Sequence, residues 1–476
     1  MNARRLATLF LLVILAGCSS RAATQQPSLE QRLDAVLNQN SSTGAIISAR
    51  VIDPQAGIEL YARFADRPMI PASNMKLFVT AAALDFLGAD HRFKTYLALD
   101  GADLCVIGTG DPATGDPRIA KAAGKKPTAI FDDWADALQK RGVTRISSVI
   151  YYDRALDEQW VHPNWSKFFL VDWYAAPVSG LNFNDNCVDI KVIPPGKLDV
   201  MPPNQIARIN NELLPGGSAP PAIARAPNAT VYTITGAATR PTDLESKPVT
   251  DPGAFFIDAM RTHFASRGLQ ISGPTRRADS FDPSLLSEPK LIAVHETAMK
   301  DLLFRLNKSS QNLFAEALCK ILGRAFEARQ GHDIAGSWEA GGRAVAAFFA
   351  KYSITPTGFR LIDGSGLARE NRITARIATD TLSVMFHHPC GKLYRESLSV
   401  AGQDGTLAKR MTDLKGHVFA KTGYIGGVRT LSGYVQTRSG RWLCFSFLFN
   451  QVPGPVKAFE ELQDQAVHVL YEYRGS

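Results

Sequence analysis

The chain has 476 residues, of which 45% are hydrophobic and 21% charged, and its formal net charge is +8. This composition excludes wholesale disorder, and the length predicts two or three domains with sizeable cores. No run of Lys and Arg is dense enough to indicate a nucleic-acid interface, so we expect no nucleic-acid partner.

The amino terminus has the pattern of an export signal. Two arginines precede an apolar run from Leu6 to Leu15 that is too short to span a bilayer, so residues 1–17 are predicted to be a signal peptide. The sequence "LAGC" resembles the bacterial lipobox, which makes Cys18 the predicted lipidation site and 18–28 a polar tether. The alternative is an ordinary signal peptide that happens to contain a cysteine. Because Ser19 follows the cysteine, the predicted location is periplasmic, on the inner leaflet of an outer membrane.

The next segment, 29–93, is predicted to begin the main domain. It contains a helical pattern, "LEQRLDAVLNQ", and two strand-like runs separated by a turn signal at 53–57. An apolar run, "LFVTAAALDFLG", then predicts a helix that is buried on most of its circumference.

Residues 94–290 differ in character and are predicted to be an insertion. Short strand-like runs dominate, and Pro and Gly are frequent between 194 and 253. We predict one insert domain made from 94–180 and 250–290, with a second, 181–249, nested within it.

Residues 291–476 are predicted to complete the main domain. Three helical patterns are followed by two predicted strands, 418–437 and 441–451, and a terminal helix. The fold class is therefore α/β: a central antiparallel sheet with helices, built from both chain ends and interrupted by nested β-rich insert domains.

The remaining cysteines favour neither a metal site nor a cofactor. They are widely spaced, with no CxxC pair. Buried free thiols are expected, and one or two disulfides stay open as an alternative. The five positions are Cys105, Cys187, Cys319, Cys390 and Cys444.

Ser73 and Lys76 form the first candidate site. Three residues apart at the start of a predicted helix, their side chains would lie on one face within hydrogen-bond reach. A serine hydroxyl needs an adjacent base to become a nucleophile, and a buried lysine with a lowered pKa can be that base. Taken alone, this pair is better explained by a capping serine and a lysine whose stem is buried and whose ammonium reaches solvent.

Ser310 and Asn312 form the second candidate, at a junction between helical patterns. The hydroxyl can relay a proton, and the amide can hold both the substrate backbone and Lys76. Lys308 adds a positive charge that we expect to help keep Lys76 neutral.

The third candidate is Lys421-Thr422-Gly423, on a predicted edge strand. The lysine and threonine can bind a substrate carboxylate, and the glycine lets a substrate backbone approach the strand. Each of the three motifs is weak alone, but their order and context together predict a serine acyl-transfer site.

These motifs resemble those of the low-molecular-mass class C penicillin-binding proteins, the D-Ala-D-Ala carboxypeptidase/endopeptidase family. The segments "PASNMKLFVTAAAL", "GTGDP", "AAPVSGLNFNDNC" and "DGSGLARENRITAR" also resemble segments of that family. The resemblance runs from about residue 30 to the end. It implies that the long separation between Ser73 and Ser310 contains the family's extra domains.

The resemblance also implies roles. Ser73 would be the nucleophile, Lys76 the base, Ser310 the proton relay, Asn312 a ligand of substrate and lysine, and Lys421 the carboxylate anchor. The chain departs from the family pattern at Gln311, which is expected to matter little, and at Tyr424, which is expected to narrow the cleft. Ser365, in a Gly-Ser-Gly turn, lacks a neighbouring base and is not a candidate nucleophile.

The predicted function is that of a D-Ala-D-Ala carboxypeptidase or endopeptidase. The implied partners are peptidoglycan stem peptides, β-lactam antibiotics and, through Cys18, a membrane; the sequence leaves the oligomeric state open. Two alternatives stand beside this function: a β-lactamase with the same acylation chemistry, and a non-catalytic peptidoglycan-binding lipoprotein.

Overall fold

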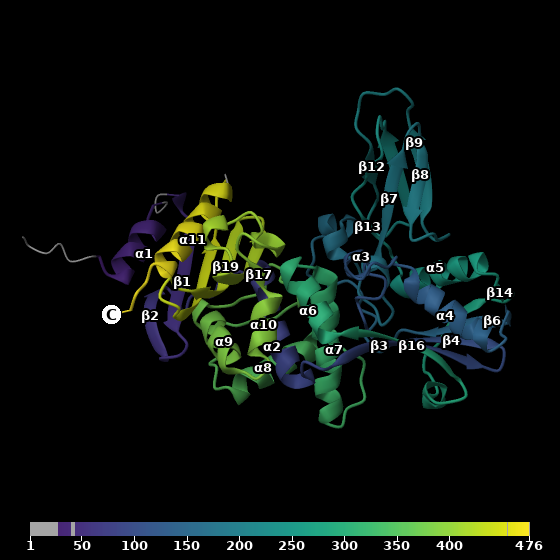
Figure 1. The fold of residues 1–476 in the computed structure, drawn as a ribbon, viewed down its shortest axis with the longest axis horizontal. Coiled ribbons are helices and arrows are strands. Elements are labelled where there is room, and N and C mark those ends of the chain that lie inside the picture. The colour runs from purple at the N-terminus through teal and green to yellow at the C-terminus, as the bar shows by residue number, and fades with distance from the viewer. Residues whose placement is uncertain (1–26, 40–42, 455, 476) are drawn as a thin grey trace, which may run out of the picture.

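A computed structural model describes residues 27–39, 43–454 and 456–475 of the chain. Figure 1 shows two bodies side by side, with a narrow β lobe projecting from the second. The predicted signal peptide and lipidation site, including Cys18, lie outside the described residues. Among the described residues, no helix is long and apolar enough to cross a membrane.

The first body is built around one antiparallel sheet to which both ends of the chain contribute. The strand order is β17-β18-β19-β20-β1-β2. The strands are β17 (Ser399–Val400), β18 (Val418–Ile425), β19 (Val428–Gln436), β20 (Trp442–Asn450), β1 (Ile46–Asp53) and β2 (Ile58–Arg63). The predicted central antiparallel sheet is confirmed, but the single strand predicted over 418–437 is wrong. Gly426 and Gly427 make that segment a hairpin of β18 and β19.

The side chains of this sheet alternate between two helical layers. On one face, Phe445 and Phe447 pack against α1 (Leu29–Leu37) and α11 (Val456–Tyr471). On the other face, Cys444 and Leu448 join the core of the remaining helices. These helices are α2 (Lys76–Leu87), α6 (Met299–Lys308), α7 (Asn312–Arg329), α8 (Trp338–Lys351), α9 (Ala375–His387) and α10 (Gly391–Ser397).

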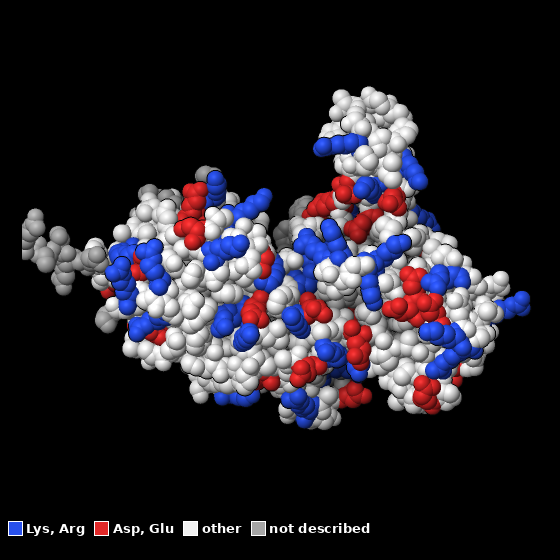
Figure 2. Space-filling view, viewed as in Figure 1, with Lys and Arg blue, Asp and Glu red and all other residues white. Residues whose placement is uncertain are grey.

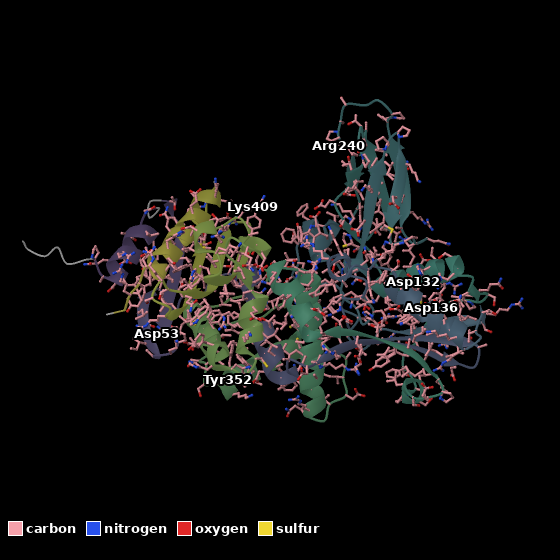
Figure 3. The ribbon with its side chains drawn as sticks, in the orientation of Figure 1. Asp53, Asp132, Asp136, Arg240, Tyr352 and Lys409 are labelled. Atoms are coloured by element: carbon pink, nitrogen blue, oxygen red, sulfur yellow. The ribbon has the colours of Figure 1, made fainter. Side chains whose placement is uncertain are left out.

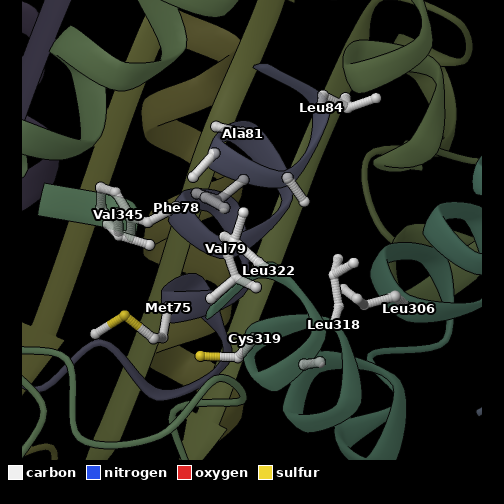
Figure 4. Close-up of a cluster of buried hydrophobic side chains, with 14 of the residues drawn as sticks. Met75, Phe78, Val79, Ala81, Leu84, Leu306, Leu318, Cys319, Leu322 and Val345 are labelled. Atoms are coloured by element: carbon white, nitrogen blue, oxygen red, sulfur yellow. The ribbon is translucent and has the colours of Figure 1, made fainter. Parts of the chain in front are cut away.

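Helix α2 runs through this core and is buried along most of its length, as predicted. Figure 4 shows Phe78 and Val79 of α2 among side chains of α7 and α8, including Leu322 and Val345. A fully apolar helix is stable only when it is surrounded by other elements, so this packing fixes the position of the residues just before it.

The second body contains a mixed five-stranded sheet in the order β15-β6-β4-β3-β16. The strands are β15 (Thr275–Arg277), β6 (Ser148–Tyr152), β4 (Asp103–Gly108), β3 (Arg92–Asp100) and β16 (Leu291–Ala298). A short pair, β5 (Arg145–Ile146) and β14 (Gln270–Ile271), extends this body, whose helices are α3 (Pro117–Ala122), α4 (Ala129–Lys140) and α5 (Pro252–Ser266).

Strand β16 corrects one predicted boundary. It pairs with β3 along its length, so 291–298 lies in the sheet of the insertion rather than in the six-stranded sheet. The insert bounds of 94–180 and 250–290 otherwise remain predictions.

The projecting lobe consists of two small sheets. One contains β7 (Cys187–Ile193), β8 (Lys197–Met201), β12 (Thr242–Asp243) and β13 (Lys247–Pro248). The other contains β9 (Arg208–Leu213), β10 (Ala222–Ala224) and β11 (Val231–Gly236). All of these strands fall within the segment predicted as the nested insert, 181–249.

Candidate active site

Ser73 lies in a short 3-10 helix, Ala72–Met75, directly before α2. It is the only residue of 71–80 that is not fully buried. Two side-chain bonds fix this turn on β19: Thr430 donates to the Pro71 carbonyl at 2.8 Å, and Asn74 donates to the Ser432 hydroxyl at 2.6 Å. The Ser73 hydroxyl is therefore held at the surface by an otherwise buried segment.

The Lys76 ammonium position is defined by three acceptors. Its Nζ lies 2.9 Å from Ser73 Oγ, 2.8 Å from Asn312 Oδ1 and 2.9 Å from the Ser365 carbonyl oxygen. Burial lowers the pKa of Lys76 to about 7, although the carboxyls of Glu316 and Asp363 oppose this shift. A lysine with this pKa supplies a neutral amine near neutral pH, which an exposed lysine cannot do.

The turn between α6 and α7 brings the second motif to the same place. Ser310 has a left-handed backbone, with φ of 56°, which a residue with a side chain rarely adopts. Asn312 begins α7, and its amide nitrogen donates to the Tyr174 carbonyl at 2.7 Å. Gln311 is buried and its side-chain oxygen accepts from the Asn312 N–H, so it stabilises the helix start.

Strand β18 supplies the third motif. Lys421 is fully buried, and its Nζ lies 2.9 Å from Ser310 Oγ. Burial, and then the nearby charge of Lys76, lower its pKa well below the usual value. The two-residue strand β17 pairs only with Phe419 and Ala420, so the strand pairing on that side ends just before the motif.

Gly423 is required by a close backbone approach. A Cβ at this position would lie 2.1 Å from Thr430 Oγ1, 2.8 Å from the Pro71 carbonyl oxygen and 3.1 Å from the Ser73 nitrogen. The strand thus reaches the Ser73 turn only because position 423 has no side chain.

Glu316 is a residue of this site that the sequence patterns did not reveal. It lies one helical turn after Asn312 and is fully buried. Its carboxylate accepts from the N–H groups of Gly364 (2.8 Å) and Ser365 (2.9 Å) and from the Trp338 indole (2.6 Å). It therefore holds the turn whose carbonyl receives Lys76. In the sequence, the only indication of a role for Glu316 was that a charged residue stands inside an apolar helical pattern.

Three motifs far apart in the sequence thus meet around the Ser73 hydroxyl. Comparison with known proteins then places the chain in a family. Residues 29–472 match the D-Ala-D-Ala carboxypeptidase 3 (S13) family. The chain belongs to the S13 family. This confirms the predicted membership of the low-molecular-mass class C penicillin-binding proteins, which are serine-type D-Ala-D-Ala carboxypeptidases.

Individual S13 relatives cover nearly the whole chain. A D-alanyl-D-alanine carboxypeptidase from an Actinomadura species is 31% identical, over 97% of this chain and 87% of its own. Carboxypeptidase DacB of Mycolicibacterium smegmatis is 27% identical, over 86% and 77% of the two chains. The crystal structure of penicillin binding protein 4 from Haemophilus influenzae has a TM-score of 0.74 at 20% identity, covering 93% and 99% of the two chains, and so shares the fold.

One predicted detail of this S13 site differs in the structure. The Lys308 ammonium is bonded to Asp404 at 2.7 Å and to the Leu398 carbonyl at 2.8 Å. Its charge is therefore paired, and burial rather than Lys308 lowers the pKa of Lys76. The effect of Tyr424 on the cleft stays a prediction; its ring is 68% exposed and lies against the Arg429 guanidinium, 3.7 Å from the ring centroid.

The cysteines and the GSG turn lie as the sequence indicated. All five described cysteines are free, and all but Cys390 are buried. Within the described residues, no group of His, Cys, Asp and Glu could hold a metal ion. Ser365 is buried beside the site and contributes its carbonyl rather than its hydroxyl.

Proposed function

We propose that Ser73 is the acylated nucleophile and that Lys76 removes its proton. The observation that carries this proposal is the 2.9 Å contact between the two side chains, combined with the lowered pKa of the buried amine. As the Ser73 oxygen bonds to the carbonyl carbon of the penultimate D-Ala, its proton passes to Lys76 Nζ. The C–N bond to the leaving amine then breaks, and water later hydrolyses the ester.

The other motifs have supporting roles in this reaction. Ser310 relays the proton toward the leaving amine, Asn312 orients Lys76, and Lys421 with Thr422 binds the substrate carboxylate. The N–H of Ser73 and the N–H of Tyr424, next to Gly423, form the oxyanion hole. The close approach of Gly423 to the Ser73 nitrogen supports this last assignment.

The proposed substrate is a peptidoglycan stem peptide. Acting as a carboxypeptidase, the enzyme releases the terminal D-Ala; acting as an endopeptidase, it cuts a D-Ala–diaminopimelate crosslink. We further propose that β-lactams acylate Ser73 and leave slowly. The fold supports this, because penicillin binding protein 4 of Haemophilus influenzae has also been solved in complex with a β-lactam, at a TM-score of 0.69.

A fluorescent penicillin tests the nucleophile directly. Wild-type protein should take up one label per chain, and Ser73→Ala should take up none. Ser284→Ala, at an exposed serine of the insertion, should label fully. Full labelling of Ser73→Ala would overturn the assignment.

Product analysis separates the possible activities. Mass spectrometry of crosslinked muropeptides should show loss of terminal D-Ala, cleavage of the crosslink, or both. Rapid, repeated hydrolysis of the antibiotic would instead identify a β-lactamase. A chain that takes no label would be a non-catalytic binding protein.

We also propose that the enzyme is exported and anchored through a lipid on Cys18. This rests on the sequence alone. Labelled palmitate should be incorporated by wild-type cells and not by cells that carry Cys18→Ala, and incorporation in the variant would rule out this anchor.

A further inference from the structure

A second cavity lies at the base of the projecting lobe, apart from the site of Ser73. Its volume is about 370 Å³, enough for a short peptide fragment. Three regions of the chain form its walls: the segment after β6, the segment of short 3-10 helices that follows it, and the lobe. The lining residues used below are Glu158, Trp160, Leu170, Ala175, Arg225 and Val249.

Arg225 is the unusual feature of this cavity. One of its Nη atoms donates to the Pro248 carbonyl, whereas its Nε is buried without a hydrogen-bond partner. Among residues 27–39, 43–454 and 456–475, no carboxylate lies within ion-pair distance of Arg225. Burial lowers the pKa of this guanidinium. A partly buried cation without a counter-charge is costly, and a bound anion relieves that cost.

The other charge on the cavity wall is already neutralised. Glu158 is paired with Arg277 at 2.6 Å and with Arg154 at 3.4 Å. The Arg277 guanidinium lies 5.1 Å from the centre of the Trp160 ring. The rest of the wall includes the apolar side chains of Leu170 and Val249. The cavity therefore presents one uncompensated positive charge beside apolar surface.

One wall of the cavity is also connected to the active site. Leu170 and Ala175 line the cavity, and the carbonyl of Tyr174, the residue before Ala175, accepts a hydrogen bond from Asn312 at 2.7 Å. Asn312 in turn holds Lys76 at 2.8 Å. A ligand in the cavity would therefore touch the segment that positions the catalytic lysine.

We propose that this cavity binds the free carboxylate of a short peptide through Arg225. The peptide is a second peptidoglycan stem, distinct from the one being cleaved; this identity of the ligand rests on the proposed function. The bound carboxylate accepts from the second Nη group of Arg225, and the apolar part of the peptide packs on Leu170 and Val249.

The test uses full-length enzyme whose Ser73 has first been acylated with penicillin, so that the active site is filled. Calorimetric titration with a stem tetrapeptide should show one saturable site. Arg225→Gln should weaken this binding by about tenfold or more, because a hydrogen bond to a charged group is lost. Arg240→Gln is the matched control: Arg240 is exposed near the tip of the same lobe (Figure 3). The Arg240→Gln variant should bind the tetrapeptide with the affinity of the wild type.

Three results would overturn the inference: no binding to the acylated wild type, unchanged binding by a folded Arg225→Gln variant, or equal binding of the tetrapeptide with its carboxylates amidated. Folding of the variant is checked by its penicillin label, which should remain at one per chain. Equal affinity for an unrelated L-peptide would overturn the stem-peptide identity of the ligand. Failure of the wild type to be acylated counts against the proposed function, and acylation without peptide binding counts against this cavity alone.

Discussion

At the scale of single residues, the proposed mechanism makes the reactivity of Ser73 depend on the charge state of Lys76. Burial lowers the pKa of Lys76 to about 7, whereas Glu316 and Asp363 favour its protonated form. The neutral amine is the form that accepts a proton. The rate of acylation by a chromogenic β-lactam should therefore fall as the pH falls through about 7, and a rate that is flat from pH 5 to 8 would contradict this role.

Glu316→Gln should shift the pH range in which the acylation rate falls, here called the acid limb of the pH–rate profile. The substitution removes a negative charge that stabilises the Lys76 ammonium, so the pKa of Lys76 falls further and the limb moves to lower pH. The rate plateau should also fall, because the amide replaces one of the acceptors that hold Gly364 and Ser365. The measurement is the acylation rate from pH 5 to 9.

Asp85→Asn is the control for this prediction. Asp85 is also a buried carboxylate, but it lies near the far end of α2, paired with Lys351 at 2.6 Å. This change should leave the acid limb in place. Equal movement of the limb in both variants would show that Glu316 has no specific effect on Lys76.

The sequence could predict the site residues whose spacing is short, but not those joined only by the fold. Ser73 and Lys76 share one helical face, so their contact follows from local geometry. The charge of Lys308 is close in sequence to Ser310, yet it pairs with Asp404, almost a hundred residues away. Glu316 was missed for the same reason, because its partners Trp338, Gly364 and Ser365 come from other elements.

At the scale of elements, the hairpin of β18 and β19 must lie against the Ser73 turn. Gly423→Ala should separate them, because the new Cβ would lie 2.1 Å from Thr430 Oγ1. We expect at least about a tenfold slower acylation and a free energy of unfolding lower by about 1–3 kcal/mol. Gly426→Ala, in the same hairpin with no atom within 4 Å of its Cβ, should change neither value.

Helix α2 depends on the core around it. Phe78 is fully buried, and its ring lies 5.1 Å from that of Phe359 and 5.9 Å from that of Phe349. Phe78→Ala should lower the free energy of unfolding by about 3–5 kcal/mol, measured in urea. Ile58→Ala, at a side chain 55% exposed on β2, should cost less than about 0.5 kcal/mol. A much smaller decrease in the free energy of unfolding for Phe78→Ala would show that the surrounding core collapses into the cavity left by the ring.

The pairing of strands distant in sequence is the part of the fold that hydrophobic patterns did not predict. Hydrophobic periodicity located most of the long helices and strands at the two ends of the chain, but it missed α5 in the insertion and carries no information on partners distant in sequence. Strand β16 was assigned to the main domain because helices follow it, whereas backbone pairing places it beside β3. The hairpin at 418–437 was read as one strand because both arms are apolar, although the Gly426-Gly427 pair was a turn signal.

At the scale of the whole molecule, one arginine joins the insertion to the helix that leads into the active site. Arg305 of α6 is bonded to Asp116 and to Asp185, each at 2.7 Å, and its side chain is only 7% exposed. Asp185 lies in a turn of three successive left-handed residues, Asn184–Asn186. Charges on the surface are interspersed in sign, as Figure 2 shows for one face, whereas this group of one arginine and two aspartates is a specific polar contact between the bodies.

Arg305→Met should therefore lower the free energy of unfolding of the whole molecule rather than loosen one loop. It leaves the buried carboxylate of Asp116 and the partly buried carboxylate of Asp185 without their counter-charge, which costs about 3–5 kcal/mol. The pKa of Asp185 is already raised by burial. An acid whose pKa is raised in the folded state loses stability as the pH rises through that range, so the deficit should be larger at pH 8 than at pH 5.

Urea unfolding of wild type and variant at both pH values is the measurement. The double variant Arg305→Met with Asp185→Asn should recover part of the loss, because only one unpaired carboxylate remains. Arg141→Met, at a half-exposed arginine paired with Glu288 at 3.3 Å, should change stability by less than about 1 kcal/mol. A deficit for Arg305→Met that is independent of pH, with no recovery in the double variant, would show that loss of packing rather than of charge pairing unfolds the protein. Arg305 would then join the two bodies through its packing rather than through its charge.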